Sequence, residues 1–378
     1  MFSNWNYPTQ VCVGAGRVQE LTLLCNQLNI TAPLLVTDAG LAELPFIQAI
    51  SRSCEKLAIQ IFSDIKPNPT GSNIIAGAKA FREGNHDAVI AVGGGSAMDA
   101  GKAIALIAKQ KCSLFELEDV GNNWQNADAR RIAPTVAIPT TAGTGSEVGR
   151  AAVIIDEDRH KKSIIFHPNM MPVQVILDPN LSIGLPPLLT AATGMDALSH
   201  SLEAFCSTSY HPMAEGIAIE GIRLVKENLP TAVLKGDNIE ARTQMLVASL
   251  MGATAFQRGL GAMHALAHPL GAIHDAHHGM LNAILMPYVL EANYAAIKTP
   301  IKRLCRYLQI ENGFDGFLEW IIQLRSELCI PSTLDSIIQG SINYEGIAEM
   351  ALADPSAATN PIQFNLKQYQ NILKSAHN

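Results

Sequence analysis

The chain has 378 residues, 48% of them hydrophobic, which is enough for two domains that each have their own core. Its formal net charge of -7 argues against nucleic acid or an anionic membrane as a partner. No uncharged apolar run is long enough to span a membrane, and the N-terminal residues lack the pattern of a secretory signal. Seven scattered cysteines without a CxxC pair favour reduced thiols, so we expect a cytoplasmic protein.

The first half of the chain alternates short β-branched runs with segments of helical period, a pattern typical of a parallel α/β sheet. The predicted strands span residues 33–37, 58–62, 88–92, 134–139, 151–155 and 173–177. The predicted helices in this half span residues 19–27, 73–82 and 97–108. From residue 188 to 374 nearly all of the chain has helical period. The predicted fold class is therefore an α/β domain, residues 1–185, followed by an all-helical domain, residues 186–378.

A glycine-rich turn that contains Gly94, Gly95 and Ser96 directly follows the strand predicted at 88–92 and opens a helix. Glycines let backbone N–H groups approach an anion closely, and a helix N-terminus adds positive partial charge, so the turn predicts a phosphate site. It is neither a GxGxxG nor a Walker loop, and its context carries the prediction. A structural interpretation also holds, in which Ser96 caps the helix and Asp99 completes a capping box.

Two further polar positions follow predicted strands. Asp38 directly follows the strand predicted at 33–37, where a carboxylate can accept hydrogen bonds from an adenine ribose and would repel a 2′-phosphate. This favours NAD over NADP, although an Asp at this place is also a common helix cap. The loop 139–147 offers four hydroxyls and two glycines, which can wrap a pyrophosphate or a nicotinamide ribose.

Six of the eleven histidines fall in two short windows, 194–200 and 261–279. Asp196 and His200 are four residues apart and share one face of a helix, as do His264 and His268, and His278 follows ten residues later. A carboxylate with three imidazoles suits Fe(II), Zn(II) or another divalent first-row ion. The alternative is that these histidines are satisfied polar residues at helix ends or on a surface.

Six motifs in this order, GGGSAMDAGKA, PTTAGTGSE, DPNL, ATGMDALSH, HALAHPLG and HHGMLNAILMPYV, strongly resemble those of the iron-containing (group III) alcohol dehydrogenases. The resemblance implies an N-terminal dinucleotide-binding α/β domain, an all-helical C-terminal domain and a metal in the interdomain cleft, the dehydroquinate synthase-like architecture. It implies as metal ligands Asp196, His200, His264 and His278. It implies as cofactor contacts Asp38, Asn68, Gly94, Gly95, Ser96, Thr140, Thr141, Thr144 and Lys162.

The resemblance also places His268 beside both metal and nicotinamide as a non-ligand. His268 or His274 is the expected proton relay, because imidazole titrates in the working pH range. The chain departs from many members of the family at two positions, since His277 stands where they have Pro and Asp275 where several have His. These departures bear on the relay and on which histidine is the last ligand.

The expected reaction is reversible hydride transfer between a small alcohol or aldehyde and nicotinamide, with Fe(II), or alternatively zinc or another divalent ion, as the Lewis acid. NAD is expected as cofactor in preference to NADP, and the family implies a homodimer. Three alternatives are a glycerol dehydrogenase-like polyol oxidoreductase, a dehydroquinate synthase-like lyase and a non-catalytic nucleotide sensor. The lyase would need basic residues around the metal, in which this region is poor, and the sensor would have lost ligands.

Overall fold

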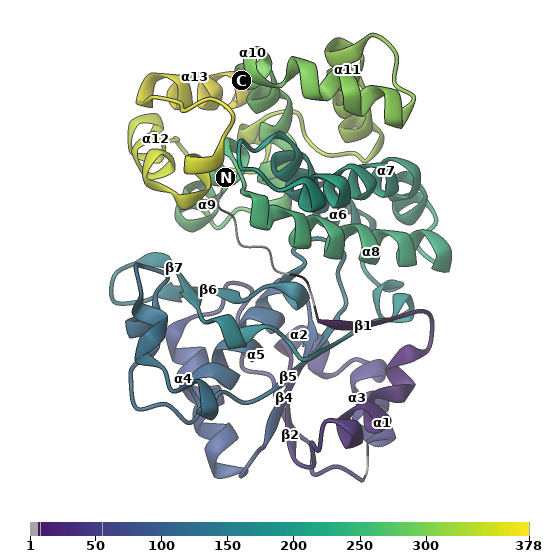
Figure 1. Ribbon diagram of the computed structural model, residues 1–378, viewed down its shortest axis with the longest axis vertical. Coiled ribbons are helices and arrows are strands. Elements are labelled where there is room, and N and C mark those ends of the chain that lie inside the picture. The colour runs from purple at the N-terminus through teal and green to yellow at the C-terminus, as the bar shows by residue number, and fades with distance from the viewer. Residues whose placement is uncertain (1–6, 8, 55, 378) are drawn as a thin grey trace. The chain divides into compact units, whose positions relative to one another are not determined.

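The computed structural model describes residues 7, 9–54 and 56–377 of the chain. Contacts between residues divide it into two units, one spanning Tyr7–Gly184 and the other beginning at Leu185, and each has its own architecture (Figure 1). The division falls beside the Pro186-Pro187 pair. What each of the two units binds stays a prediction.

The unit Tyr7–Gly184 is an α/β fold. Its described residues form a parallel sheet with the strand order β1-β8-β5-β4-β2-β3. The strands of this sheet are β1 (Gln10–Val13), β2 (Pro33–Val36), β3 (Gln60–Phe62), β4 (Ala88–Gly93), β5 (Thr135–Pro139) and β8 (Gln174–Leu177). The helices are α1 (Leu21–Gln27), α2 (Ala39–Ala42), α3 (Pro45–Ser53), α4 (Gly71–Glu83) and α5 (Gly95–Ile107). Every residue of β2, β4, β5 and β8 is buried, as expected for strands covered on both faces.

Three strands of this unit differ from the sequence-based expectation. The strand predicted at 151–155 is β6 (Ala151–Asp156), which pairs antiparallel with β7 (Lys161–Phe166) and lies outside the parallel sheet. β7 was not predicted, because it begins with two lysines and only its second half is apolar. β1 was not predicted either; it is a four-residue edge strand with three apolar residues, none of them buried.

The second unit is helical. Its helices are α6 (Pro187–Cys206), α7 (Pro212–Leu234), α8 (Ile239–Ala255), α9 (Ala262–His274), α10 (His278–Leu308), α11 (Gly313–Glu327), α12 (Tyr344–Ala353) and α13 (Leu366–His377). The predicted order of an α/β part followed by an all-helical part is confirmed. All seven cysteines are free, and within the described residues no helix is long and apolar enough to cross a bilayer.

Helix α6 is the centre of the helical unit, packed against α7, α8 and α10 (Figure 1). Fifteen of its twenty residues are buried, many of them Ala, Ser or Gly, and small side chains let neighbouring helices approach closely. The approach of α10 is closest at Gly279, where an added Cβ would lie 2.2 Å from the backbone oxygen of Ala192. This contact fixes the start of α10, and therefore the position of His278, against α6.

We therefore expect Gly279→Ala to lower the free energy of unfolding by about 1–3 kcal/mol, because a backbone atom cannot give way as a flexible side chain can. The matched control is Gly216→Ala in α7, where an added Cβ meets nothing within 4 Å. That substitution should stabilise the protein by about 0.5–1 kcal/mol through the better helix propensity of Ala. Urea unfolding of both variants measures the difference, and equal stabilities would contradict the close packing of α10 on α6.

Candidate functional site

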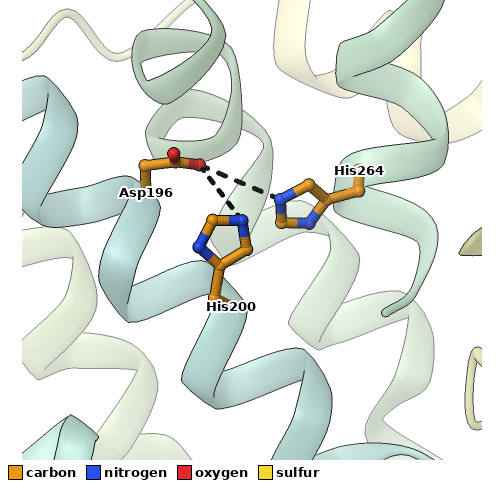
Figure 2. A group of neighbouring side chains, drawn as sticks. All are labelled: Asp196, His200 and His264. Atoms are coloured by element: carbon orange, nitrogen blue, oxygen red, sulfur yellow. Dashed lines mark ion pairs between the residues drawn. The ribbon is translucent and has the colours of Figure 1, made fainter. Parts of the chain in front are cut away.

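Four side chains converge inside the helical unit. Asp196 and His200 lie one turn apart on α6, His264 is in the first turn of α9, and His278 begins α10. The distances from the Asp196 Oδ1 atom to the Nε2 atoms of His200, His264 and His278 are 4.0, 3.8 and 3.5 Å. Figure 2 shows the first three side chains pointing toward one another, and their ligand atoms lie within 4.8 Å of each other.

Asp196 and His264 are in the protonation states that metal ligands need. Burial opposes ionisation of Asp196, but the neighbouring imidazoles of His200, His278 and His264 and the amide of Asn282 outweigh it and lower the pKa of this carboxyl to about 2. Burial holds the pKa of His264 well below its ordinary range, so its imidazole is neutral. An ionised carboxylate beside a neutral imidazole is the form that coordinates a divalent ion.

The donor set fits a first-row metal. Ligand atoms that share one ion at about 2.0–2.2 Å lie roughly 3–4 Å from each other, which is the range of the separations around Asp196. Three of the four side chains are nearly fully buried, and that of His278 is one third exposed. The Asn282 Nδ2 atom lies 3.3 Å from His264 Nε2 and 3.1 Å from His278 Nε2. Both Nε2 atoms therefore lie beside a hydrogen-bond donor.

Two carboxylates lie beside this cluster. Glu203 is on α6, seven residues after Asp196, and its Oε2 atom lies 2.6 Å from His264 Nδ1. Burial raises the pKa of Glu203 to about 7, although hydrogen bonds from backbone N–H groups at the start of α9 act in the opposite direction and lower it. The second carboxylate, Asp354, lies 2.8 Å from His268 Nδ1, and the His268 ring stacks on the ring of His278 with 5.5 Å between centroids.

The other expected histidines of this window lie at helix ends. His274 is the last residue of α9, and Asp275 follows it in the left-handed conformation. Among the described residues, no ring contact joins His274 to the cluster, so its role stays a prediction. His277 is the N-cap of α10, and its side chain is exposed, whereas His278 makes the contacts with Asp196 and Asn282. The geometry therefore favours His278 over His277 as the last candidate ligand.

Most of the cofactor candidates in the α/β unit lie at one edge of its parallel sheet. Asp38 follows β2, Gly94 and Gly95 follow β4, and the threonines of the loop 140–144 follow β5, which are neighbouring parallel strands. The Thr140 N–H donates to the Gly93 carbonyl at 2.9 Å, and a Cβ on Gly95 would lie 2.7 Å from Thr144. Gly94 lies similarly close to Thr141. Lys162 donates to the Asn68 side chain at 3.0 Å.

The capping box predicted at the start of α5 is wrong. The N-cap is Gly94, which has no side chain, and the Ser96 hydroxyl donates instead to the Pro67 carbonyl. Asp99 accepts from the Val153 N–H at 2.8 Å and from the Ser146 hydroxyl, so it links α5 to the loop after β5. Because no side chain caps α5, its first N–H groups remain directed at the glycine-rich turn. Asp38 does act as a cap, since its Oδ1 accepts from the Leu41 N–H at 3.0 Å.

A buried pair of charged residues supports this loop. Lys102 is 2% exposed and donates to the carbonyls of Ser146 and Ala151 at 2.9 and 2.5 Å. Burial lowers the pKa of Lys102, although the charge of Asp99 opposes the change. Burial also raises the pKa of Glu147, in the same loop, to about 7. The loop that carries the predicted threonine contacts is thus anchored from within α5.

Sequence reasoning missed Glu203, Asn282 and Asp354. The first two had a local signal, since Glu203 is seven residues after Asp196 and Asn282 is four residues after His278, and each spacing places the pair on one helix face. Asp354 had none, because it is 86 residues away from the histidine that it contacts.

Comparisons with known proteins agree with this fold. The family model described as "Iron-containing alcohol dehydrogenase" matches residues 8–179, and "Fe-containing alcohol dehydrogenase family, C-terminal" matches residues 190–377. The chain is 35% identical to a 4-hydroxybutyrate dehydrogenase of Cupriavidus necator, with 98% of both chains covered. It is also 35% identical to an NAD-dependent methanol dehydrogenase of Bacillus methanolicus, with 99% and 100% covered.

The solved structures give the same result. A crystal structure of 1,3-propanediol oxidoreductase has a TM-score of 0.95 and 32% identity, with all of both chains covered. A sulfoacetaldehyde reductase from Bifidobacterium kashiwanohense, solved with NAD+, has a TM-score of 0.92 and 27% identity, with 100% and 99% covered. The relatives and the family models show a metal-dependent oxidoreductase acting on alcohols. The chain belongs to the iron-containing alcohol dehydrogenase family.

From the raised pKa of Glu147 we predict that the stability of the protein depends on pH. Between its ordinary value of 4.5 and about 7 the folded protein binds more protons than the unfolded chain, so the free energy of unfolding falls as pH rises through this window. Glu147→Gln should remove this contribution, which is on the order of 1–3 kcal/mol. Urea unfolding at pH 5 and pH 8 measures it. The same pH dependence in the variant and the parent protein would show that Glu147 is not a source of this loss.

Proposed function

We propose that the protein is an NAD(H)-linked alcohol dehydrogenase and aldehyde reductase that holds Fe(II) with Asp196, His200, His264 and His278. The observation that carries the proposal is a buried group of Asp196, His200 and His264 with ligand atoms within 4.8 Å of each other, beside which His278 Nε2 lies 3.5 Å from Asp196. Zinc or another divalent ion also suits this donor set. A bound divalent ion would supply the Lewis acid for reversible hydride transfer between a small alcohol and nicotinamide.

The protein's own residues prepare this reaction by position and charge. Asp196 contributes one negative charge against a dication, which leaves net positive charge for a substrate oxygen. Phe256 packs edge-on against the His200 ring with 5.2 Å between centroids, and Met263 is buried beside His264. Apolar neighbours limit the access of water and favour a small, largely apolar alcohol or aldehyde.

A proton must also leave the substrate, and His268 is the proposed relay. Its Nδ1 atom lies 2.8 Å from Asp354, so an Nδ1–H group donates to that carboxylate and Nε2 is left as the base. The side chain is 29% exposed, which gives the proton a route to solvent. Asp354 stays ionised, because its bond to His268 and the backbone N–H of Ser356 lower its pKa despite burial. His274 is the second candidate for the relay.

The residues around the sheet edge support NAD as cofactor. We assign cofactor contacts to Asp38, Asn68, Gly94, Gly95, Ser96, Thr140, Thr141, Thr144 and Lys162. The N–H groups at the start of α5 suit a pyrophosphate, since α5 has no side-chain cap. The Asp38 carboxylate suits ribose hydroxyls and opposes a 2′-phosphate, which favours NAD over NADP.

The substrate is proposed to be a small alcohol or aldehyde without an anionic group. Relatives are named for 4-hydroxybutyrate, 1,3-propanediol and methanol, so the family accommodates different alcohols. Arg258, six residues before His264, donates to the carbonyls of Ser209 and Phe205 and pairs with Glu215, so its charge is already used within the fold. We further propose that the enzyme is a cytoplasmic homodimer, as the family resemblance implies.

The first test is an anaerobic assay of NADH and NADPH oxidation with short aldehydes, comparing apo-protein with protein loaded with Fe(II) or Zn(II). Turnover should need a metal and prefer NADH. His264→Ala and His278→Ala should each lower turnover by more than about 100-fold, because loss of a ligand exceeds the roughly 10–100-fold effect of an outer partner. The matched control is His160→Asn, which changes an exposed histidine of the other unit. Metal-independent turnover would contradict the proposal, and turnover with glycerol alone would favour the polyol alternative.

The preference for NADH is tested at Asp38. Asp38→Gly removes the charge that opposes a 2′-phosphate, so we expect the ratio of kcat/KM for NADH to that for NADPH to fall at least about tenfold, equivalent to about 1.4 kcal/mol. The matched control is Glu83→Gln, which removes an exposed charge at the end of α4, before β4 begins and therefore at the opposite edge of the sheet. An unchanged ratio in Asp38→Gly would show that another residue sets the cofactor preference.

A further inference from the structure

Glu203 is a buried carboxylate with contacts to both the histidine cluster and the start of α9. Its Oε2 atom accepts from the Gly261 N–H at 2.9 Å and lies 2.6 Å from His264 Nδ1. Its Oε1 atom accepts from the Met263 N–H at 2.7 Å. The side chain is 4% exposed, so solvent does not substitute for these partners. Nothing in the proposed hydride transfer requires this carboxylate.

We propose that Glu203 is a positioning residue of the metal centre, which holds His264 as the Nδ1–H tautomer so that the Nε2 lone pair faces Asp196. This inference rests on the proposed function, because it takes His264 to be a ligand. A neutral imidazole carries its single proton on one nitrogen, and the hydrogen bond made by one nitrogen decides the state of the other. A carboxylate partner of this kind also orients the ring and raises its basicity.

Contacts at both ends of the His264 ring support this tautomer. At the Nδ1 end, Glu203 Oε2 is an acceptor, since it already receives the Gly261 N–H. At the Nε2 end, the Asn282 amide nitrogen lies 3.3 Å away and is a donor, because the same nitrogen donates to Asp196 Oδ1 at 2.9 Å. A proton on Nε2 would face this donor and leave the Glu203 carboxylate without its imidazole partner. The Nδ1–H tautomer satisfies both ends.

The same carboxylate caps α9, and this second role must be separated from the first. Gly261 is the N-cap and has no side chain, and a Cβ there would lie 2.8 Å from Glu203 Oε1. Asn360 completes the cap, since its Oδ1 accepts from the Ala262 N–H at 3.1 Å. No described contact joins Asn360 to the His264 imidazole. Asn360→Ala is therefore a control that weakens the same helix start without removing the partner of His264.

The experiment measures zinc affinity and tautomer in purified full-length apo-protein. A chromogenic chelator competes for Zn(II), and nitrogen-15 NMR of histidine-labelled apo-protein reports which ring nitrogen carries the proton, with His264→Ala assigning the signal. Glu203→Ala should weaken zinc binding by about 10–100-fold. In this variant His264 should also lose its single Nδ1–H state. Asn360→Ala should keep that state and bind zinc within about threefold of the parent protein, since it leaves the imidazole contact intact.

Glu203→Gln keeps the experiment decisive if Glu203→Ala does not fold. Gln retains one acceptor oxygen but must place its NH2 group against a backbone N–H of Gly261 or Met263, so its zinc affinity should lie between those of Glu203→Ala and the parent. Parental affinity in both Glu203 variants, or an equal loss in Asn360→Ala, would overturn the positioning role. A parent protein that binds no zinc, or His264→Ala that binds as tightly as the parent, would instead overturn the proposed function.

Discussion

The buried charge of Asp196 is the constraint on which the helical unit depends. An ionised carboxylate that is 3% exposed inside packed helices is costly unless opposite charge or hydrogen-bond donors surround it. The Asn282 amide on α10 donates to this carboxylate at 2.9 Å, and the imidazoles of His200 on α6, His264 on α9 and His278 on α10 lie within 4.0 Å of it. A divalent ion shared by these groups would supply the opposite charge. The positions of α9 and α10 against α6 are therefore tied to the same group that makes the cluster suitable for a divalent ion.

In both units, polar groups of the candidate sites lie where helices begin. In the α/β unit the first N–H groups of α5 carry no side-chain cap, which suits an anion. In the helical unit His264 is in the first turn of α9, and His278 is the first residue of α10. At the start of α9 the N–H groups donate to the side chains of Glu203 and Asn360. These N–H groups therefore hold the site's own residues in place and do not bind an anionic ligand. Chemically similar helix starts thus have different uses because their caps differ.

The features that could be predicted from the sequence are those that depend on the local spacing of residues. The order of an α/β part and a helical part followed from apolar periodicity, and Asp196 with His200 followed from a separation of one helical turn. The capping box at Ser96 and Asp99 was wrong, because both side chains bond to residues far along the chain, Pro67 and Ser146. The partner of His268 had no local signal for the same reason. β6 and β7 are consecutive strands that pair antiparallel, and strand-like composition alone does not specify that β6 lies outside the parallel sheet.

The most direct test of the central claim is X-ray diffraction from crystals grown anaerobically with Fe(II), with data collected on both sides of the iron absorption edge. We predict one strong anomalous difference peak in each chain, within coordination distance of Asp196 and of the Nε2 atoms of His200, His264 and His278. Such a peak would establish that these four side chains form one metal centre. A peak bound by other residues, or none in crystals of protein that turns over with Fe(II), would contradict the account.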